Sequence, residues 1–232
     1  MWIYGVTQTN FQLNRGSVTL YPYLNQIRSG DLTGKSTQIR QKRHKMALTK
    51  TPVCNFGQPA VDFNLPGTDG KSWSLLDCRG EKGTLVMFIC NHCPYVKAIQ
   101  EHLVRDTREL LAIGVKSVAI MPNDVSAYPE DSLENMAGVA QQYHYPFPYL
   151  YDETQETARA YGAVCTPDFF GYNASLELQY RGRLDETTPS HQAPAGAPRE
   201  LFDAMRRIAE TGKGPEQQTL SMGCSIKWRN GG

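Results

Sequence analysis

Two cysteines three positions apart are the residues of this 232-residue chain best suited to chemistry. They lie in the segment Cys90-Asn91-His92-Cys93-Pro94. Thiols at this spacing can close a small disulfide with little backbone movement, and the amides of a first helical turn stabilise a thiolate there. Pro94 favours the first helical position, which makes Cys93 the N-cap residue and leaves Cys90 nearer solvent. We therefore predict a reversible redox dithiol, with Cys90 as the attacking thiolate and Cys93 as the resolving thiol.

His92 lies between the two cysteines, and its charge depends on its surroundings. A positive charge beside a thiol lowers the pKa of that thiol and stabilises the thiolate of the reduced protein. A stabilised reduced form makes the couple more oxidising. We therefore expect His92 to tune the reduction potential of the pair.

The two cysteines can also be read as half of a metal site. A structural zinc ion needs four ligands, normally including a second closely spaced Cys or His pair. The remaining cysteines and histidines stand alone at Cys54, Cys78, Cys165, Cys224, His44, His102, His144 and His191. We therefore expect no metal and no cofactor, and a non-enzymatic thiolate metal binder is the second alternative to a redox protein.

Strands and helices alternate from about Pro52 onward, which is typical of an α/β domain with a mostly parallel sheet. The run at 84–90 is nearly continuously apolar, as in a strand covered on both faces, and a helix is expected from Pro94 to about Gly114. Asp131 and Glu134 form a candidate capping box for the helix expected at 133–140. The other expected elements are strands at 116–121, 147–151, 169–172 and 176–181, and helices at 133–140, 155–161 and from Pro198.

Alternating apolar residues on both sides of Asp69-Gly70 predict a hairpin ahead of the first buried strand. The complete pattern predicts a three-layer α/β domain with a central mixed sheet and this hairpin as an N-terminal extension. The two cysteines then lie where the first buried strand meets its helix.

Residues 1–50 differ from the rest of the chain in charge. They hold eight Lys and Arg residues and one Asp, a net charge of +7, whereas the remainder carries −6 and the whole chain +1. Their polar, aperiodic composition predicts disorder. We favour the interpretation that this segment is a non-functional extension and that the natural protein starts at Met46. A transit peptide for organellar import and a nucleic-acid patch at 40–45 are weaker interpretations. We therefore predict a domain at 51–232, with a C-terminal tail from about 213.

The composition bounds the class of protein. No apolar run approaches the roughly 20 residues of a membrane span, and a net charge of +1 argues against a dedicated nucleic-acid surface. A chain of this length buries enough surface to need no disulfide scaffold. We expect a cytoplasmic protein with no membrane or nucleic-acid partner.

Several segments after about residue 52 carry a family resemblance. They include Gly57-Gln58-Pro59-Ala60-Val61-Asp62-Phe63-Asn64-Leu65, Phe88-Ile89-Cys90-Asn91-His92-Cys93-Pro94, Ala163-Val164-Cys165-Thr166-Pro167-Asp168-Phe169-Phe170, Tyr180-Arg181-Gly182-Arg183 and Gly223-Cys224-Ser225-Ile226-Lys227-Trp228. Together they resemble the thioredoxin superfamily, and within it the peroxiredoxin-like alkyl hydroperoxide reductase/thiol-specific antioxidant branch. The resemblance implies a thioredoxin fold in which a cis-proline loop, Thr166-Pro167, packs against the dithiol and presents backbone to a substrate disulfide.

The sequence departs from peroxiredoxins at the peroxide pocket. That family carries Thr or Ser three residues before the peroxidatic cysteine and Pro seven residues before it. With Cys93 aligned there, those positions hold Cys90 and Val86. Arg181 or Arg183 can replace the family's peroxide-orienting arginine, although a solvent-facing strand arginine is the favoured interpretation. The departure argues against efficient peroxide reduction.

The residues and the resemblance together predict a thiol-disulfide oxidoreductase with an antioxidant role. Its substrates are expected to be protein or small-molecule disulfides or hydroperoxides, with a thiol as electron donor. The first alternative is a thiol-dependent peroxide reductase with Cys93 peroxidatic and Cys90 resolving. Cys165 and Cys224 are possible auxiliary thiols, and Cys165 is the stronger candidate because it lies beside the expected cis-proline.

Overall fold

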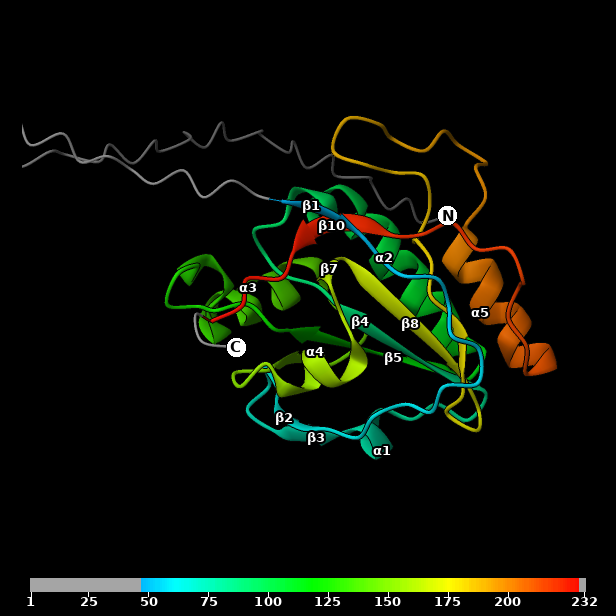
Figure 1. Cartoon of the computed structure of the whole chain (residues 1–232), viewed down its shortest axis with the longest axis horizontal. Helices are drawn as coiled ribbons and strands as arrows, with labels where there is room; N and C mark the ends of the chain where they lie inside the picture. The colour runs from blue at the N-terminus through cyan, green and yellow to red at the C-terminus, as the bar shows by residue number, and fades with distance from the viewer. Residues whose placement is uncertain (1–46, 230–232) are drawn as a thin grey trace, which may run out of the picture. The chain divides into compact units, whose positions relative to one another are not determined.

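A five-stranded mixed sheet is the centre of the computed structural model, which describes residues 47–229 (Figure 1). The strand order is β6-β5-β4-β8-β9. The first three are mutually parallel, whereas β8 runs antiparallel to β4 and β9 antiparallel to β8. These strands are β4 (Gly83–Phe88), β5 (Val115–Met121), β6 (Tyr149–Tyr151), β8 (Asp168–Asn173) and β9 (Leu178–Tyr180).

Helices cover both faces of this sheet. Alternate residues of the central strands point to opposite sides, and in β4 both sets are buried, so each face needs a covering layer. Leu85 and Met87 join one apolar cluster with residues of α2 (Pro94–Ala112), α3 (Leu133–Tyr143) and α5 (Glu200–Thr211). Val86 and Phe88 join a second cluster with α1 (Leu75–Cys78) and α4 (Glu156–Tyr161). The prediction of a three-layer α/β arrangement with a mixed sheet is confirmed.

The predicted hairpin is present but short. Strands β2 (Asn64–Pro66) and β3 (Ser72–Ser74) pair antiparallel, with Leu65 opposite Trp73. Gly70 between them has a φ of +78°, the left-handed conformation that glycine adopts at little cost. Ser74 then caps α1 in a reciprocal capping box with Asp77, so the second strand ends before Leu75.

A second, three-stranded antiparallel sheet has the order β1-β10-β7. Its strands are β1 (Leu48–Lys50), β10 (Met222–Ser225) and β7 (Cys165–Thr166). Figure 1 shows β10 beside β1, near the beginning of α2. Residues 48–50 therefore belong to this sheet, three residues ahead of the predicted domain boundary, and the predicted C-terminal tail contains a strand. The predictions for residues 1–46 lie outside the described residues.

The predicted capping box at Asp131 is wrong. Asp131 ends a short 3₁₀ turn, η1 (Pro129–Asp131), and is fully buried. Ser132 is the N-cap residue of α3, and its hydroxyl accepts a hydrogen bond from the backbone N–H of Asn135. The Asp131 carboxylate is turned inward to other partners. Within residues 47–229, no helix has the length and apolar character needed to cross a membrane.

Candidate redox site

Cys90 and Cys93 lie in the connection between β4 and α2. Pro94 begins α2 and Cys93 is its N-cap residue, as predicted. Both side chains are covered, with 1% of Cys90 and 0% of Cys93 exposed. The predicted exposure of Cys90 is wrong, because its sulfur is covered and lies 3.3 Å from the Thr166 hydroxyl.

Thr166 contacts both thiols. The Thr166–Pro167 peptide bond is cis, as the resemblance implies. The Cys93 thiol donates to the Thr166 carbonyl oxygen at 3.0 Å, while the Thr166 hydroxyl lies beside Cys90. The structure therefore brings together two segments more than seventy residues apart in sequence.

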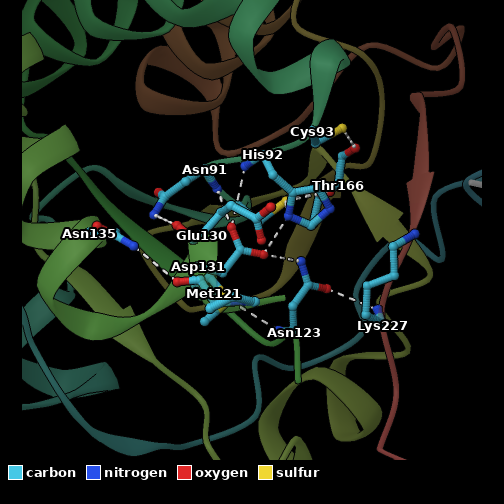
Figure 2. A network of polar contacts seen from close by, with 12 residues as sticks. Asn91, His92, Cys93, Met121, Asn123, Glu130, Asp131, Asn135, Thr166 and Lys227 are labelled. Carbon is cyan, nitrogen blue, oxygen red and sulfur yellow. Dashed lines mark hydrogen bonds and ion pairs between the residues drawn. The ribbon is translucent and has the colours of Figure 1, made fainter. Parts of the chain in front are cut away.

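Asp131 is the partner of His92 (Figure 2). His92 Nδ1 lies 2.7 Å from Asp131 Oδ2, and the imidazole ring stacks on Tyr128 with ring centroids 5.0 Å apart. The same nitrogen is 3.9 Å from Cys90 Sγ. A positive charge on His92 would be offset by this carboxylate, which weakens its effect on the neighbouring thiol.

The Asp131 carboxylate also holds the backbone of the dithiol loop. Its Oδ1 accepts the N–H of Asn91 at 2.8 Å and the N–H of His92 at 3.3 Å. Its Oδ2 accepts the side-chain amide of Asn123 at 2.8 Å. Both oxygens thus have two donors, which satisfies a carboxylate with no exposed surface.

Polar contacts extend from this carboxylate to distant parts of the chain. Asn123 Oδ1 accepts the N–H of Lys227, and Asn91 Oδ1 accepts the Tyr149 hydroxyl. The Asn91 amide donates to the Glu130 carbonyl at 2.9 Å (Figure 2). The loop between the cysteines is therefore tied to the segment around η1, to β6 and to the chain after β10.

The two thiols have opposite electrostatic surroundings. Burial, the contact with Cys93 and the charge of Asp131 raise the pKa of Cys90 well above its ordinary value. Contacts with the Cys224 and Cys90 thiols, and the backbone N–H groups of Cys224 and Val96, lower the pKa of Cys93 in spite of its burial. The Thr166 carbonyl oxygen accepts from Cys93 and so favours its protonated thiol. The groups that donate to the Cys93 sulfur are more numerous than this one acceptor, and they favour the thiolate. The predicted order, with the low pKa on Cys90, is reversed.

Of the two expected auxiliary thiols, the structure brings Cys224 to the dithiol. It lies in β10 directly opposite Thr166, and its side chain contacts that of Cys93. Cys165 is fully buried, its sulfur lies 3.5 Å from the Pro167 carbonyl oxygen, and burial raises its pKa. The contacts therefore favour Cys224 over Cys165 as the auxiliary thiol, because strand pairing places Cys224 beside Cys93.

The two candidate peroxide-orienting arginines are paired elsewhere. Arg181 is buried, lies 3.0 Å from Asp168 Oδ2, and stacks over the ring of Phe170 on the opposite face of the sheet. Arg183 donates two hydrogen bonds to Glu200 Oε1. The solvent-facing interpretation is wrong for Arg181, whose guanidinium neutralises a buried carboxylate.

Cys90, His92 and Asp131 are also the candidate metal ligands of the site, with donor atoms within 4.8 Å of one another. A cation there would have to displace hydrogen bonds from an Asp131 carboxylate that already has four. The donor set therefore fits the positioning of His92 and the dithiol loop better than it fits a metal.

An open cleft of about 1170 Å³ adjoins the site on the side of His92 and Asn91. Side chains of α2 and α3 line its walls, among them Lys97, Gln100 and Glu134. The cleft gives a polar molecule access to the edge of the dithiol loop.

Comparison with known proteins identifies relatives of the chain. An uncharacterized conserved protein from Geobacillus kaustophilus is 44% identical, with a TM-score of 0.76, over 81% of this chain and 100% of that one. A hypothetical protein from Sinorhizobium meliloti is 36% identical, with a TM-score of 0.73, over 79% of this chain and 100% of that one. No protein with curated annotation matches the chain.

The fold is shared more widely. The thioredoxin domain of a thiol-disulfide oxidoreductase from Bacteroides vulgatus is 13% identical, with a TM-score of 0.52, over 68% of this chain and 99% of that one. The predicted thioredoxin-like fold is thereby confirmed. The AhpC/TSA family model matches residues 56–187, the segment that contains both cysteines of the dithiol and the cis-proline loop. The chain therefore belongs to the AhpC/TSA family.

Proposed function

We propose that the protein is a thiol-disulfide oxidoreductase in which Cys90 and Cys93 alternate between dithiol and disulfide. The observation that carries the proposal is the mutual contact of the two thiols at the N-terminus of α2, beside Thr166. Membership of the AhpC/TSA family supports thiol redox chemistry in general. An antioxidant role in the cytoplasm is part of the same proposal.

The N-cap position and the lowered pKa of Cys93 support giving it the first step. Its thiolate attacks one sulfur of a substrate disulfide, forms a mixed disulfide and releases the other sulfur as a thiolate. The Cys90 sulfur then attacks Cys93 Sγ, closes the Cys90–Cys93 disulfide and releases the second substrate sulfur, which leaves with the Cys90 proton. An external thiol reduces the protein for the next cycle.

Access to Cys93 is expected beside the cis-proline. Pro167 lines a small cavity of about 70 Å³ with Tyr95, Ile99 and Met222. Because both sulfurs are covered, exchange requires a local opening of the segments around them. The lining also includes Arg183, Asp185 and Thr187, so protein or small-molecule disulfides with both apolar and polar flanks suit this cavity.

Serine variants of the two thiols test the proposal. We expect Cys93→Ser to abolish steady-state reduction of insulin disulfides by dithiothreitol above the uncatalysed rate, and Cys90→Ser to lower it. Cys165→Ser is the matched control, because it removes a buried thiol that contacts the Pro167 carbonyl, and it should keep the wild-type rate. Wild-type turnover by the Cys93→Ser variant would overturn the proposal.

A peroxide reductase is the second candidate, and the N-cap position of Cys93 with its lowered pKa favours it. The Cys93 thiolate would attack a hydroperoxide, forming a sulfenic acid and an alcohol, and the Cys90 thiol would then close the disulfide and release water. Because Cys90 replaces the pocket hydroxyl, we expect hydroperoxide consumption to be slow beside disulfide exchange. Fast consumption by a protein that does not reduce disulfides would reverse this ranking.

A further inference from the structure

Cys93 contacts a thiol besides Cys90. Cys224 lies in β10, whose register places it opposite Thr166, the residue whose carbonyl accepts the Cys93 thiol. The side chains of Cys93 and Cys224 are in hydrogen-bond contact, and both belong to the same buried cluster. Cys93 is therefore shared between two possible disulfide partners on different elements of the fold.

Strand β10 is fixed on both sides, so this contact is built into the fold. A Cβ atom added at Gly223 would lie 2.0 Å from the Thr166 carbonyl oxygen, which shows how closely β10 approaches β7. The Ser221 hydroxyl donates to the Pro167 carbonyl at 2.9 Å, and the N–H of Thr51 donates to the Ser221 carbonyl at 3.0 Å. Cys224 thus has the same rigid neighbours as the cis-proline loop.

We propose that Cys224 is a third redox thiol of the site, which exchanges with the Cys90–Cys93 disulfide by attacking Cys93. The proposal rests on the proposed function, which supplies that disulfide. The Cys224 sulfur forms a bond to Cys93 Sγ as the Cys90–Cys93 bond breaks, and the proton of Cys224 passes to Cys90. One disulfide and one thiol are present before and after the step, so no further oxidant is needed.

The two thiols that flank Cys93 have similar buried surroundings. Contact with Cys93 and burial raise the pKa of Cys224, and burial foremost raises that of Cys90. The pKa shift has the same direction at both thiols, and each can in turn be displaced from Cys93 Sγ. The transfer frees Cys90, which lies beside His92 at the edge of the polar cleft, while the disulfide moves to β10.

Disulfide mapping of the full chain tests this step, because trypsin separates the thiols. Cys90 and Cys93 share the peptide 83–97, whereas Cys224 lies in 214–227. Purified protein is oxidised with diamide, its remaining thiols are blocked with N-ethylmaleimide, and the digest is analysed by mass spectrometry. Wild type should give an internal disulfide in 83–97 and also the linked pair of peptides.

Each variant has a distinct expected result. Cys90→Ser should give only the linked pair, Cys224→Ser only the internal disulfide, and Cys165→Ser should give both, as the matched control. If Cys90→Ser gives no linked pair while Cys224→Ser still closes its internal disulfide, the third thiol is refuted and the proposed function stands.

Failure of the proposed function has a different signature. In that case neither wild type nor Cys224→Ser forms the internal disulfide. A linked pair that persists in Cys93→Ser and is lost in Cys90→Ser would assign the contact to Cys90 and overturn the inference. The wild-type pattern supports or contradicts the proposal even where a variant does not fold.

Discussion

The buried carboxylate of Asp131 gives a quantitative test of how the dithiol loop is held. Its two oxygens accept hydrogen bonds from the backbone N–H groups of Asn91 and His92, from the Asn123 amide and from the His92 ring. In Asp131→Asn the amide oxygen can keep the two backbone bonds. The new NH₂ group then places donors where Oδ2 accepted from Asn123 and His92.

The expected loss follows from those two hydrogen bonds. A hydrogen bond to a charged group contributes about 1.5–3 kcal/mol, so losing two lowers the free energy of unfolding by about 3–6 kcal/mol. In a domain of this size each kcal/mol corresponds to about 2–4 °C, so Tm should fall by about 6–24 °C. The pKa of Cys90 should also fall, because the charge of Asp131 is one of the causes that raise it.

Urea unfolding followed by circular dichroism measures the first effect, and thiolate absorbance against pH measures the second. Glu130→Gln is the matched control, because it makes the same charge change at the exposed neighbouring residue. We expect that control to stay within about 0.5 kcal/mol of wild type. If Asp131→Asn lowers stability by less than about 1 kcal/mol and leaves the pKa of Cys90 unchanged, the carboxylate does not hold the loop.

Three further changes probe the thiols and β10. Cys224→Ala removes a hydrogen bond to the Cys93 thiolate and should raise the pKa of Cys93 by about 1–2 units. Cys224→Ser keeps a donor at this position and should leave the pKa of Cys93 close to its wild-type value. A thiolate titration that is unchanged in Cys224→Ala would contradict this. The folded-state pKa of Cys93 lies below its ordinary value of 9.0. The thiolate therefore contributes its full stabilisation at a pH above 9.0, and this stabilisation decreases as the pH falls toward the folded-state pKa. Cys93→Ser should therefore flatten this part of the profile of unfolding free energy, and an unaltered slope would argue against the thiolate. Gly223→Ala should lower the free energy of unfolding by about 1–3 kcal/mol, because the new Cβ would clash with the Thr166 carbonyl. The control Gly138→Ala has open space around its Cβ and should not destabilise the protein. Equal melting temperatures for the two variants would refute the close approach of β10.

The dithiol and the central strands could be predicted because their signals are local. The apolar run that forms β4 and the proline that begins α2 place Cys93 at the helix start without any knowledge of the rest of the chain. The end of α4 could be predicted in the same way, because Gly162 follows the helix and has a φ of +63°, which glycine adopts easily.

Asp131 and β10 could not be predicted in the same way, because their roles depend on distant partners. Asp131 lies 39 residues from His92 in sequence, and its position before α3 offered a local explanation as a helix cap, which Ser132 provides instead. Strand β10 is four residues long and contains no alternating apolar pattern. Burial of Cys90 was missed for the same reason, since residues at a helix start do not reveal what a remote segment places over them.

The pairing of β10 with β1 and β7 also determines when the site can be completed during synthesis. Thr51 and Ser221, which hydrogen-bond to each other beside the paired strands β1 and β10, are 170 residues apart in sequence. A ribosome releases the β4–α2 connection long before it reaches Ser225, so the nascent chain carries Cys90 and Cys93 without β10 over them. Contacts of such large sequence separation form slowly. The newly made chain thus passes through a stage in which Cys93 lacks its contact with Cys224.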